Sequence, residues 1–321
     1  MKFLKTIITI ISALSLTPVI AQNYPLKPIS LIVPYGAGGG SDSRTRQVAQ
    51  FLSQELGQPV VVDNKSGAGG NIGTEFVAKS KADGYTLGMG NFAPLSVNKA
   101  LFKKLGFEPE KDLIPITLIE KGPLVLCVST KSHYKTVNDI IAAAKAKPGT
   151  LTFSSGGIGG SHHLSGELFK QSTGIDMIHV PYKSGSAATT DLLAGNVDMM
   201  FEHMYSALPN IQGGKVRPIA ITSVKRSSLL PNVPSFTELG HPKVVVLNWQ
   251  GIIAPANTPP EVIAKLNKAL NKVLQLPEMR EKITAQGNEV GGGTPEEFGT
   301  LIRSESQKWA TVVRLANIKP E

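Results

Sequence analysis

Short apolar runs alternate with segments in which apolar residues recur every three or four positions along most of this chain. The runs are typical of buried strands, and the periodic segments are typical of amphipathic helices. We expect strands at residues 29–33, 60–62, 86–89, 116–119, 124–128, 151–154, 177–180, 197–201, 216–222 and 249–254, and helices at 42–56, 71–80, 137–145, 161–171, 186–193, 260–274 and 295–316. This alternation predicts an α/β fold built from βαβ units, with mainly parallel sheets flanked by helices.

The N-terminal segment has a different pattern. Residues 1–5 are basic, residues 6–16 are apolar, and Val19-Ile-Ala21 has the small-x-small shape of a cleavage site. We therefore predict that residues 1–21 are a signal peptide, cleaved after about Ala21, and that the protein is exported. A membrane anchor is the alternative, but the apolar run is shorter than the roughly 20 residues that a span needs. No cysteine lies near the cut, so a lipid anchor is not expected.

The single cysteine and the length bear on how the mature protein is held together. Cys127 is alone in the chain, so no disulfide can form within it, and its apolar surroundings favour a buried strand residue over a thiol nucleophile. The mature chain of about 300 residues is long enough for two domains that rely on their hydrophobic cores. The segments near residues 124 and 220 are natural hinges between them.

The charge balance suggests an anionic partner. The formal net charge is +9, and it becomes +7 when Lys2 and Lys5 leave with the signal peptide. Such a balance attracts anions over a distance. The lysines are scattered and no aromatic residues are interleaved with them, so nucleic acid is not an expected partner.

A glycine-rich turn follows the first expected strand. Glycines 36, 38, 39 and 40 allow the main chain to bend and to approach a ligand closely, and Ser41 or Asp42 can cap the next helix. The unpaired N–H groups of a first helical turn, together with the positive end of its dipole, suit an anion. This segment is therefore a candidate anion site.

Three kinds of enzyme motif also contain glycine-rich turns. Gly36-Ala-Gly38-Gly-Gly-Ser41 approximates a dinucleotide fingerprint, but serine stands at its last position and only Asp63 is available as the acidic residue after the second strand. Neither a Gly-Lys-Ser/Thr phosphate loop nor a Gly-x-Ser-x-Gly nucleophile elbow is present. No nucleotide cofactor is therefore expected.

Several motifs make the chain resemble a known receptor family over essentially its whole mature length. The motifs are Tyr24-Pro-Leu-Lys-Pro-Ile-Ser-Leu-Ile-Val-Pro34, Gly38-Gly-Gly-Ser-Asp42, Gly57-Gln-Pro-Val-Val-Val-Asp-Asn64, Gly67-Ala-Gly-Gly-Asn-Ile-Gly73, Ala82-Asp-Gly-Tyr-Thr-Leu87, Phe153-Ser-Ser-Gly-Gly157, His163-Leu-Ser-Gly-Glu-Leu-Phe169, His179-Val-Pro-Tyr-Lys183, Asp191-Leu-Leu-Ala-Gly195, Val197-Asp-Met-Met-Phe201 and Gly292-Gly-Thr-Pro-Glu-Glu-Phe298. In this order and spacing they resemble the Bug-type periplasmic solute receptors of tripartite tricarboxylate transport systems.

The resemblance implies a two-lobed, type II periplasmic binding-protein fold that closes around a small organic carboxylate. It implies lobe I at residues 23–124 and 223–321 and lobe II at 125–222. It further implies a periplasmic protein without catalysis or cofactor, a monomer that passes its ligand to membrane transport subunits or to a sensor. The competing hypothesis is an exported metal-binding protein or hydrolase that uses His163.

The expected ligand site lies beyond the carboxyl ends of the strands, where loops meet helix N-termini. The candidate ligand-binding residues are Tyr35, Gly39, Gly40, Ser41, Asp42, Asn91, Ser155, Gly157, Gly159, Ser161, His163, Tyr182, Lys183 and Glu202. Glu202 and His203 follow the strand expected at 197–201 and form part of the floor. No arginine lies in these loops, so we expect backbone N–H groups, hydroxyls and bridging water to hold the carboxylate, and Lys183 to add charge. Asp42 repels an anion and is expected to cap backbone donors or to accept from a ligand hydroxyl.

His162, His163 and Glu167 raise the alternative of a metal site. His163 and Glu167 are four residues apart and share one face of a helix. The family motif favours a different role, in which His163 caps or packs at the helix start, and no metal site is therefore predicted.

The identity of the carboxylate stays open at this point. Three features depart from the common pattern of the family: Tyr35-Gly-Ala37, Ile158 and the pair Glu202-His203. Trp249 and Tyr182 are expected in the core or in the wall of the cleft. Tricarboxylates, dicarboxylates, aromatic acids and amino acids are all compatible with the sequence.

Overall fold

A computed structural model describes residues 24–319 of the chain. The predicted signal peptide lies outside these residues. The strands are β1 (Ile29–Val33), β2 (Val60–Asn64), β3 (Thr86–Asn91), β4 (Leu113–Ser129), β5 (Thr152–Ser155), β6 (Ile178–Pro181), β7 (Met199–His203), β8 (Val216–Ile221), β9 (Leu247–Pro255) and β10 (Glu289–Gly292). The α-helices are α1 (Gly40–Leu56), α2 (Asn71–Ala78), α3 (Asn98–Leu101), α4 (Pro109–Asp112), α5 (Val137–Ala146), α6 (Ser161–Thr173), α7 (Gly185–Ala194), α8 (Met204–Gln212), α9 (Pro260–Gln275), α10 (Pro277–Thr284) and α11 (Pro295–Leu315).

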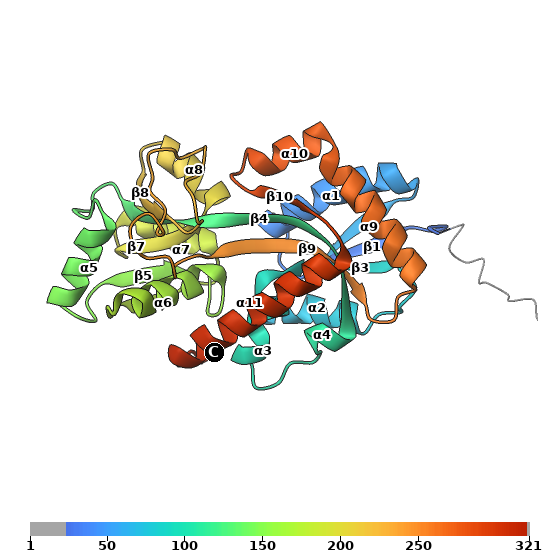
Figure 1. The fold of residues 1–321 in the computed structure, drawn as a ribbon, viewed down its shortest axis with the longest axis horizontal. Coiled ribbons are helices and arrows are strands. Elements are labelled where there is room, and N and C mark those ends of the chain that lie inside the picture. The colour runs from blue at the N-terminus through green and yellow to red at the C-terminus, as the bar shows by residue number, and fades with distance from the viewer. Residues whose placement is uncertain (1–23, 320–321) are drawn as a thin grey trace, which may run out of the picture.

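Two long strands connect the two ends of the molecule. Figure 1 shows β4 and β9 running side by side along the long axis, with β1 and β3 at one end and β5 and β7 at the other. The strand order is β2-β1-β3-β9-β4-β7-β5-β6, and β8 and β10 also pair with β4. β4 therefore belongs to both halves of the fold.

The pairing of β4 changes at the middle of the strand. Its residues from Leu113 to Pro123 pair with β9, whereas Leu124 and the following residues pair with β7 and β8. The sequence led us to expect two separate extended runs here, at 116–119 and 124–128. The backbone continues through Pro115, Gly122 and Pro123 because its neighbours supply hydrogen bonds on either side, with register shifts that absorb the irregular positions.

The direction of the strands differs between the outer and the middle parts of the sheet. β1 is parallel to β2 and β3, and β5 is parallel to β6 and β7, as the βαβ pattern predicted. In the middle, β4 runs antiparallel to β7, β8, β9 and β10, and β9 runs antiparallel to β3. The sheets are thus mixed, because β4 and β9 cross between the halves in opposite directions.

The segment between β8 and β9 packs on the half that contains β5 and β7. The ring of Phe236 lies 5.4 Å from that of Phe169 and 5.9 Å from that of Phe201. Thr222 is fully buried beside Leu124, where β4 passes from one half to the other, and it accepts a hydrogen bond from Leu124 N–H (2.8 Å) and donates to the carbonyl of Val246 (2.6 Å). The lobe boundaries at 124 and 223 stay a prediction.

Helices cover the sheet and bury its apolar faces. α9 packs Val262, Ile263, Leu266, Leu270 and Val273 into the core, which is the stripe expected from their helical spacing. α11 lies along β4 and β9 in Figure 1, and its Val312 carbonyl accepts from Gln171 of α6. Within residues 24–319, none of the helices combines the length and the apolarity that a membrane crossing requires.

Candidate functional site

A cleft of about 540 Å³ is lined by residues from both halves of the fold. One wall comes from Tyr35 and Gly36 after β1, residues 66–70 before α2, and Leu101 and its neighbours around α3. The opposite wall comes from the loop at residues 156–160, between β5 and α6, and from Tyr182 and Lys183 after β6. The cleft thus lies where loops follow the carboxyl ends of parallel strands, as expected for ligand sites in such folds.

Some of the predicted site residues form the wall of this cleft, and the others lie elsewhere. Tyr35, Gly157, Tyr182 and Lys183 line it directly. The remaining candidates are grouped around the N-termini of α1 and α6 and are Gly39, Gly40, Ser41, Asp42, Asn91, Ser155, Gly159, Ser161, His163 and Glu202.

The N-terminus of α1 has free backbone donors. Gly39 is its N-cap residue, and no side chain caps it, so the expected capping by Ser41 or Asp42 was wrong. The N–H groups of Gly40, Ser41 and Asp42 have no hydrogen-bond partner among the described residues. Three unpaired donors at the positive end of a helix dipole form an arrangement that suits an oxyanion.

The carboxylate of Asp42 holds the glycine-rich turn. One oxygen accepts from Gly38 N–H (2.9 Å) and the other from the Asn64 side chain (2.9 Å), while Arg46 forms an ion pair with it (3.0 Å). Burial acts to raise the pKa of Asp42, but the hydrogen bonds from Arg46, Gly38 and Asn64 outweigh it and lower the pKa. The charge of Asp42 is therefore balanced locally, and its carboxylate accepts from a backbone N–H of the turn, at Gly38, rather than from the first turn of α1.

Asn91 presents an unpaired polar atom beside this helix end. Its side-chain N–H donates to Ser41 Oγ and to Gln250 Oε1, each at 3.2 Å. The residue is only 7% exposed, and its Oδ1 atom is buried without a hydrogen-bond partner among the described residues. An unpaired buried amide oxygen is costly, so this position is suited to a partner outside the chain.

The two arginines near the first turn are used inside the scaffold. Arg44 is buried and pairs with Glu120 (3.0 Å), and Arg46 pairs with Asp42. No arginine is among the described residues that line the cleft, which agrees with the expectation from the loops. Lys183 is exposed at the cleft wall and supplies the positive charge there.

The N-terminus of α6 repeats the arrangement of α1. Its N-cap residue is Gly160, without a side-chain cap, and the N–H groups of Ser161, His162 and His163 have no partner among the described residues. Ser161 Oγ lies 2.8 Å from His203 Nε2. Gly159 N–H donates to His163 Nδ1 (3.1 Å), so His163 caps the helix start as the motif suggested.

His163 and Ser155 connect the loop before α6 to His179. The His163 ring stacks on that of His179 at 3.7 Å, and burial lowers the pKa of His163 to about 3, so the ring is neutral. Ser155 Oγ bonds His179 Nε2 (2.6 Å) and the carbonyl of Gly157 (3.0 Å). The hydroxyl of Ser155 is thus engaged within its own half, whereas Gly157 reaches the cleft wall.

Two tyrosines flank the cleft. Tyr182 donates to Asp191 (2.6 Å), which raises the pKa of its hydroxyl to about 12. Tyr35 is half-buried and lies against Gly70, where an added Cβ would be 3.1 Å from its hydroxyl. Both side chains are neutral donors and contribute shape and hydrogen bonds rather than charge.

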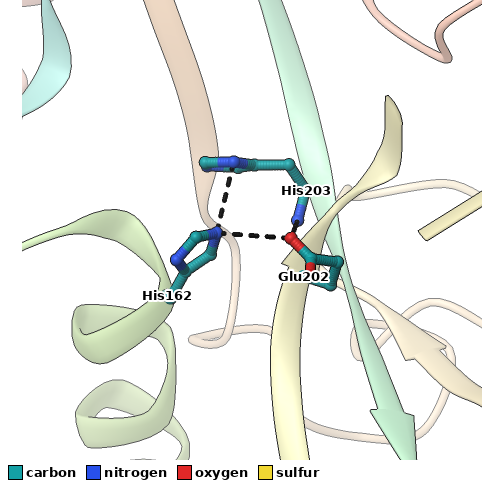
Figure 2. A group of neighbouring side chains, drawn as sticks. All are labelled: His162, Glu202 and His203. Carbon is teal, nitrogen blue, oxygen red and sulfur yellow. Dashed lines mark hydrogen bonds and ion pairs between the residues drawn. The ribbon is translucent and has the colours of Figure 1, made fainter. Parts of the chain in front are cut away.

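The structure brings together three side chains that the sequence did not reveal as a group. Figure 2 shows His162 from α6 facing Glu202 and His203 at the end of β7. His162 Nε2 lies 3.2 Å from His203 Nδ1 and 3.6 Å from Glu202 Oε1. Burial lowers the pKa of His162 to about 4 and that of His203 well below its usual range, while it raises the pKa of Glu202 to about 7.

This cluster replaces the metal-ligand set that the sequence suggested. His163 Nε2 is 3.8 Å from Glu167, but its Nδ1 is engaged with Gly159, and neither residue faces Glu202. Glu202 and His203 are the last residues of β7 rather than residues of the loop after it. His162, Glu202 and His203 are the group whose ligand atoms converge in the described part of the chain.

Tyr205 joins the two helix ends and was missed by sequence reasoning. Its hydroxyl lies 3.2 Å from His203 Nδ1, and a Cβ added at Gly40 would lie only 2.7 Å from the same oxygen. Tyr205 belongs to α8, which was not predicted because it begins directly after β7 and contains Pro209. Leu101 and Ile158 were not among the predicted site residues either, although Ile158 had been marked as a departure from the family pattern.

Comparison with known proteins connects this geometry to one family. A family model described as "Tripartite tricarboxylate transporter family receptor" matches residues 44–318. The chain is also 40% identical to Protein BugT of Bordetella pertussis over 303 residues, which cover 94% of this chain and 93% of BugT.

Two solved structures share both the fold and the sequence. A protein of R. palustris with adipate is 33% identical, with a TM-score of 0.86, over 93% of this chain and 100% of its own. MatC from Rhodopseudomonas palustris with bound malate is 29% identical, with a TM-score of 0.82, over 90% of this chain and 100% of its own. These likenesses confirm the two-lobed binding-protein fold expected from the sequence.

Proposed function

Since the chain belongs to the receptor family of the tripartite tricarboxylate transporters, we propose that it binds a small organic carboxylate in the cleft between its halves and delivers it to the membrane subunits of such a transporter. In this proposal backbone amides, hydroxyls and water hold the ligand, and the receptor acts in the periplasm without catalysis. The observation that carries the proposal is the pair of uncapped helix N-termini, each of which follows a loop that lines the cleft.

Side chains connect the two helix ends. A Cβ added at Gly40 of α1 would meet Tyr205, Tyr205 bonds His203, and His203 bonds Ser161 of α6, so a tyrosine and a histidine link the two sets of free N–H groups. A dicarboxylate offers one oxyanion to each set. The adipate and malate of the two solved relatives are dicarboxylates, which supports this class as the first to test.

Neutral donors are the main source of affinity in this proposal. Asp42 and the nearby arginines already neutralise one another, and Lys183 stands at the wall of the cleft. Backbone N–H groups at helix ends bind a carboxylate through direct hydrogen bonds and through the helix dipole. The unpaired Oδ1 of Asn91 can accept from a ligand hydroxyl, such as one on a hydroxy acid.

The hydrolase alternative finds no support at His163. Its ring is buried against His179, and its Nδ1 accepts from Gly159 N–H. A general base has to reach a substrate proton at hydrogen-bond distance, and this ring does not line the cleft. The family and the solved relatives with high identity are solute-binding receptors.

A thermal-shift panel tests the proposal directly. The mature protein, without a tag, is heated with adipate, malate, citrate, benzoate or glutamate, and at least one of them should raise the melting temperature by mass action. Absence of any shift at millimolar concentrations would contradict the proposal. Delivery is tested in the native host, where deletion of the receptor gene should abolish uptake of the acid that binds.

A pair of variants tests the role of the backbone. Gly40→Pro and Gly40→Ala both add a Cβ at the same place, but only proline removes the N–H, and proline is tolerated in the first helical turn. The proposal expects Gly40→Pro to bind at least about 5-fold more weakly than Gly40→Ala, because a hydrogen bond to a charged group is lost. Equal affinities would show that this amide does not hold the ligand.

A further inference from the structure

We propose that His162, Glu202 and His203 form a binding site for one divalent transition-metal ion, with Zn²⁺ as the probe. The site departs from the metal-free receptor expected from the sequence. It also differs from the pair His163 and Glu167 that first raised the question of a metal. Two imidazole nitrogens and one carboxylate oxygen are a donor set that zinc and its neighbours in the first transition row bind.

The distances between the ligand atoms fit a single ion. His162 Nε2 lies 3.2 Å from His203 Nδ1 and 3.6 Å from Glu202 Oε1 (Figure 2), and all three ligand atoms lie within 4.8 Å of one another. Around tetrahedral zinc, ligand bonds of about 2.0–2.1 Å place neighbouring ligand atoms about 3.3–3.4 Å apart. A cation between these atoms therefore requires only small side-chain movements.

The charge of the cluster also favours a cation. His162 is buried and His203 is partly buried, and Glu202 has no Lys or Arg ion-pair partner among the described residues. A buried carboxylate without a compensating cation is costly. A divalent ion at this position would replace that missing charge.

Neighbouring groups hold the ligands in a suitable orientation. Ser161 Oγ lies at 2.8 Å from His203 Nε2, so a hydrogen bond there leaves His203 Nδ1 as the acceptor that faces the cluster. The Thr189 hydroxyl donates to the second oxygen of Glu202. Metal binding would break one contact of His162. Its Nδ1 accepts from Gly156 N–H at 3.4 Å. When Nε2 binds the ion, the ring proton moves from Nε2 to Nδ1, and Nδ1 can then no longer accept that hydrogen bond.

The fourth position on the ion is open to a small ligand. Tyr205 Oη is 3.2 Å from His203 Nδ1, so its hydroxyl gives up that contact when an ion takes the lone pair of the nitrogen. Water or a solute carboxylate can fill the fourth position, and Tyr205 also lies beside Gly40, where an added Cβ would meet its hydroxyl. The proposed metal site does not depend on which ligand fills the fourth position, whereas a metal-bound solute carboxylate rests on the proposed function.

The test titrates Zn²⁺ into untagged, chelator-treated protein and follows binding by calorimetry and by competition with a chromophoric chelator. We expect one ion per chain with a Kd below about 10 μM. Glu202→Gln should weaken zinc binding at least about 100-fold, a larger loss than is typical when a group behind a ligand is removed. His133 is exposed and is not one of the clustered residues, so His133→Asn is the matched control and should leave the affinity unchanged.

Three outcomes would overturn the site. They are the absence of stoichiometric zinc, an unchanged affinity in a folded Glu202→Gln variant, and loss of zinc in His163→Gln but not in Glu202→Gln. Circular dichroism checks that each variant folds, and the visible spectrum of the cobalt-loaded wild type reports the coordination without any substitution. A carboxylate that binds in the presence of chelator, without zinc binding, keeps the proposed function and removes the metal site. Zinc binding without any carboxylate binding keeps the metal site and removes the proposed function.

Discussion

Replacing Gly40 by alanine should weaken solute binding by holding the two halves of the protein apart. A Cβ at this position would lie 2.7 Å from the hydroxyl oxygen of Tyr205 and 2.8 Å from Cζ of its ring. Ordinary contacts of a Cβ atom are 3.4–4 Å. The tyrosine ring would therefore have to retreat by more than half an ångström, and it is the side chain that joins α8 to the N-terminus of α1.

The size of the effect follows from the cost of overpacking. Extra atoms in a well-packed contact cost about 1–3 kcal/mol. If the solute binds the arrangement in which Tyr205 touches Gly40, this energy is taken from the binding free energy and weakens the affinity by roughly 5- to 150-fold. The stability of α1 itself should not fall, because alanine is favoured over glycine in a helix by up to about 1 kcal/mol.

A double-mutant cycle with Tyr205→Ala isolates the contact. Affinity for the carboxylate that gives the largest thermal shift is measured by calorimetry for the wild type, both single variants and the double variant. In the Tyr205→Ala background, Gly40→Ala should change the affinity less than about 3-fold, because the ring that it meets is gone. Urea unfolding of each variant separates a change in binding from a change in folding.

The reasoning fails if Gly40→Ala binds as the wild type does, since the Cβ would then be accommodated without separating the halves. It also fails if Gly40→Ala loses the same affinity with and without the Tyr205 ring. That result would place the effect on the backbone of α1 rather than on the contact with α8.

Three further predictions concern the scaffold. Thr222→Val leaves a buried backbone N–H of the crossing strand without its partner and should lower the free energy of unfolding by about 1–3 kcal/mol in urea, whereas Thr222→Ser should retain most of it; equal stability of the two variants would contradict this. Glu120→Gln leaves the buried guanidinium of Arg44 unpaired and should cost about 3–5 kcal/mol, and a loss below 1 kcal/mol would show that its other partners suffice. Asp42→Asn should be less stable than the wild type above about pH 5, because the folded-state pKa of Asp42 lies below its ordinary value near 4. The difference in the free energy of unfolding should shrink as the pH falls below 4. A difference that does not depend on pH would refute the role of the charge of Asp42.

The elements that sequence analysis located well are those defined by local patterns. β1 was predicted with its observed bounds, because a run of five residues between Pro28 and Pro34 leaves little choice. The start and end of α9 follow from the proline at its first position and from the apolar stripe of the helix. β4 was divided in two because Pro115 and Pro123 interrupt its pattern, and pairing with distant strands, which no local pattern records, carries it through.

The candidate site divides in the same way. The free donors at Gly40 and Ser161 follow from glycines next to helix starts, a local feature that the sequence displays. The cluster of His162 and His203 does not, because the two residues are 41 positions apart and meet only when α6 lies beside β7. Tyr205 was missed for the same reason, since the residue that it meets, Gly40, is far from it in the sequence.

The use of both nearby arginines inside the scaffold has a consequence for how the cleft binds an anion. Arg44 is tied to Glu120 and Arg46 to Asp42, so neither charge is free to pair with a ligand. In the proposed binding mode without a metal ion, the attraction comes from helix-end amides and from Lys183 at the wall. Salt screens exposed charges strongly and buried dipoles much less. The affinity should therefore depend on the shape and spacing of the ligand's oxygens more than on ionic strength, and the salt-sensitive part should disappear with the charge of Lys183.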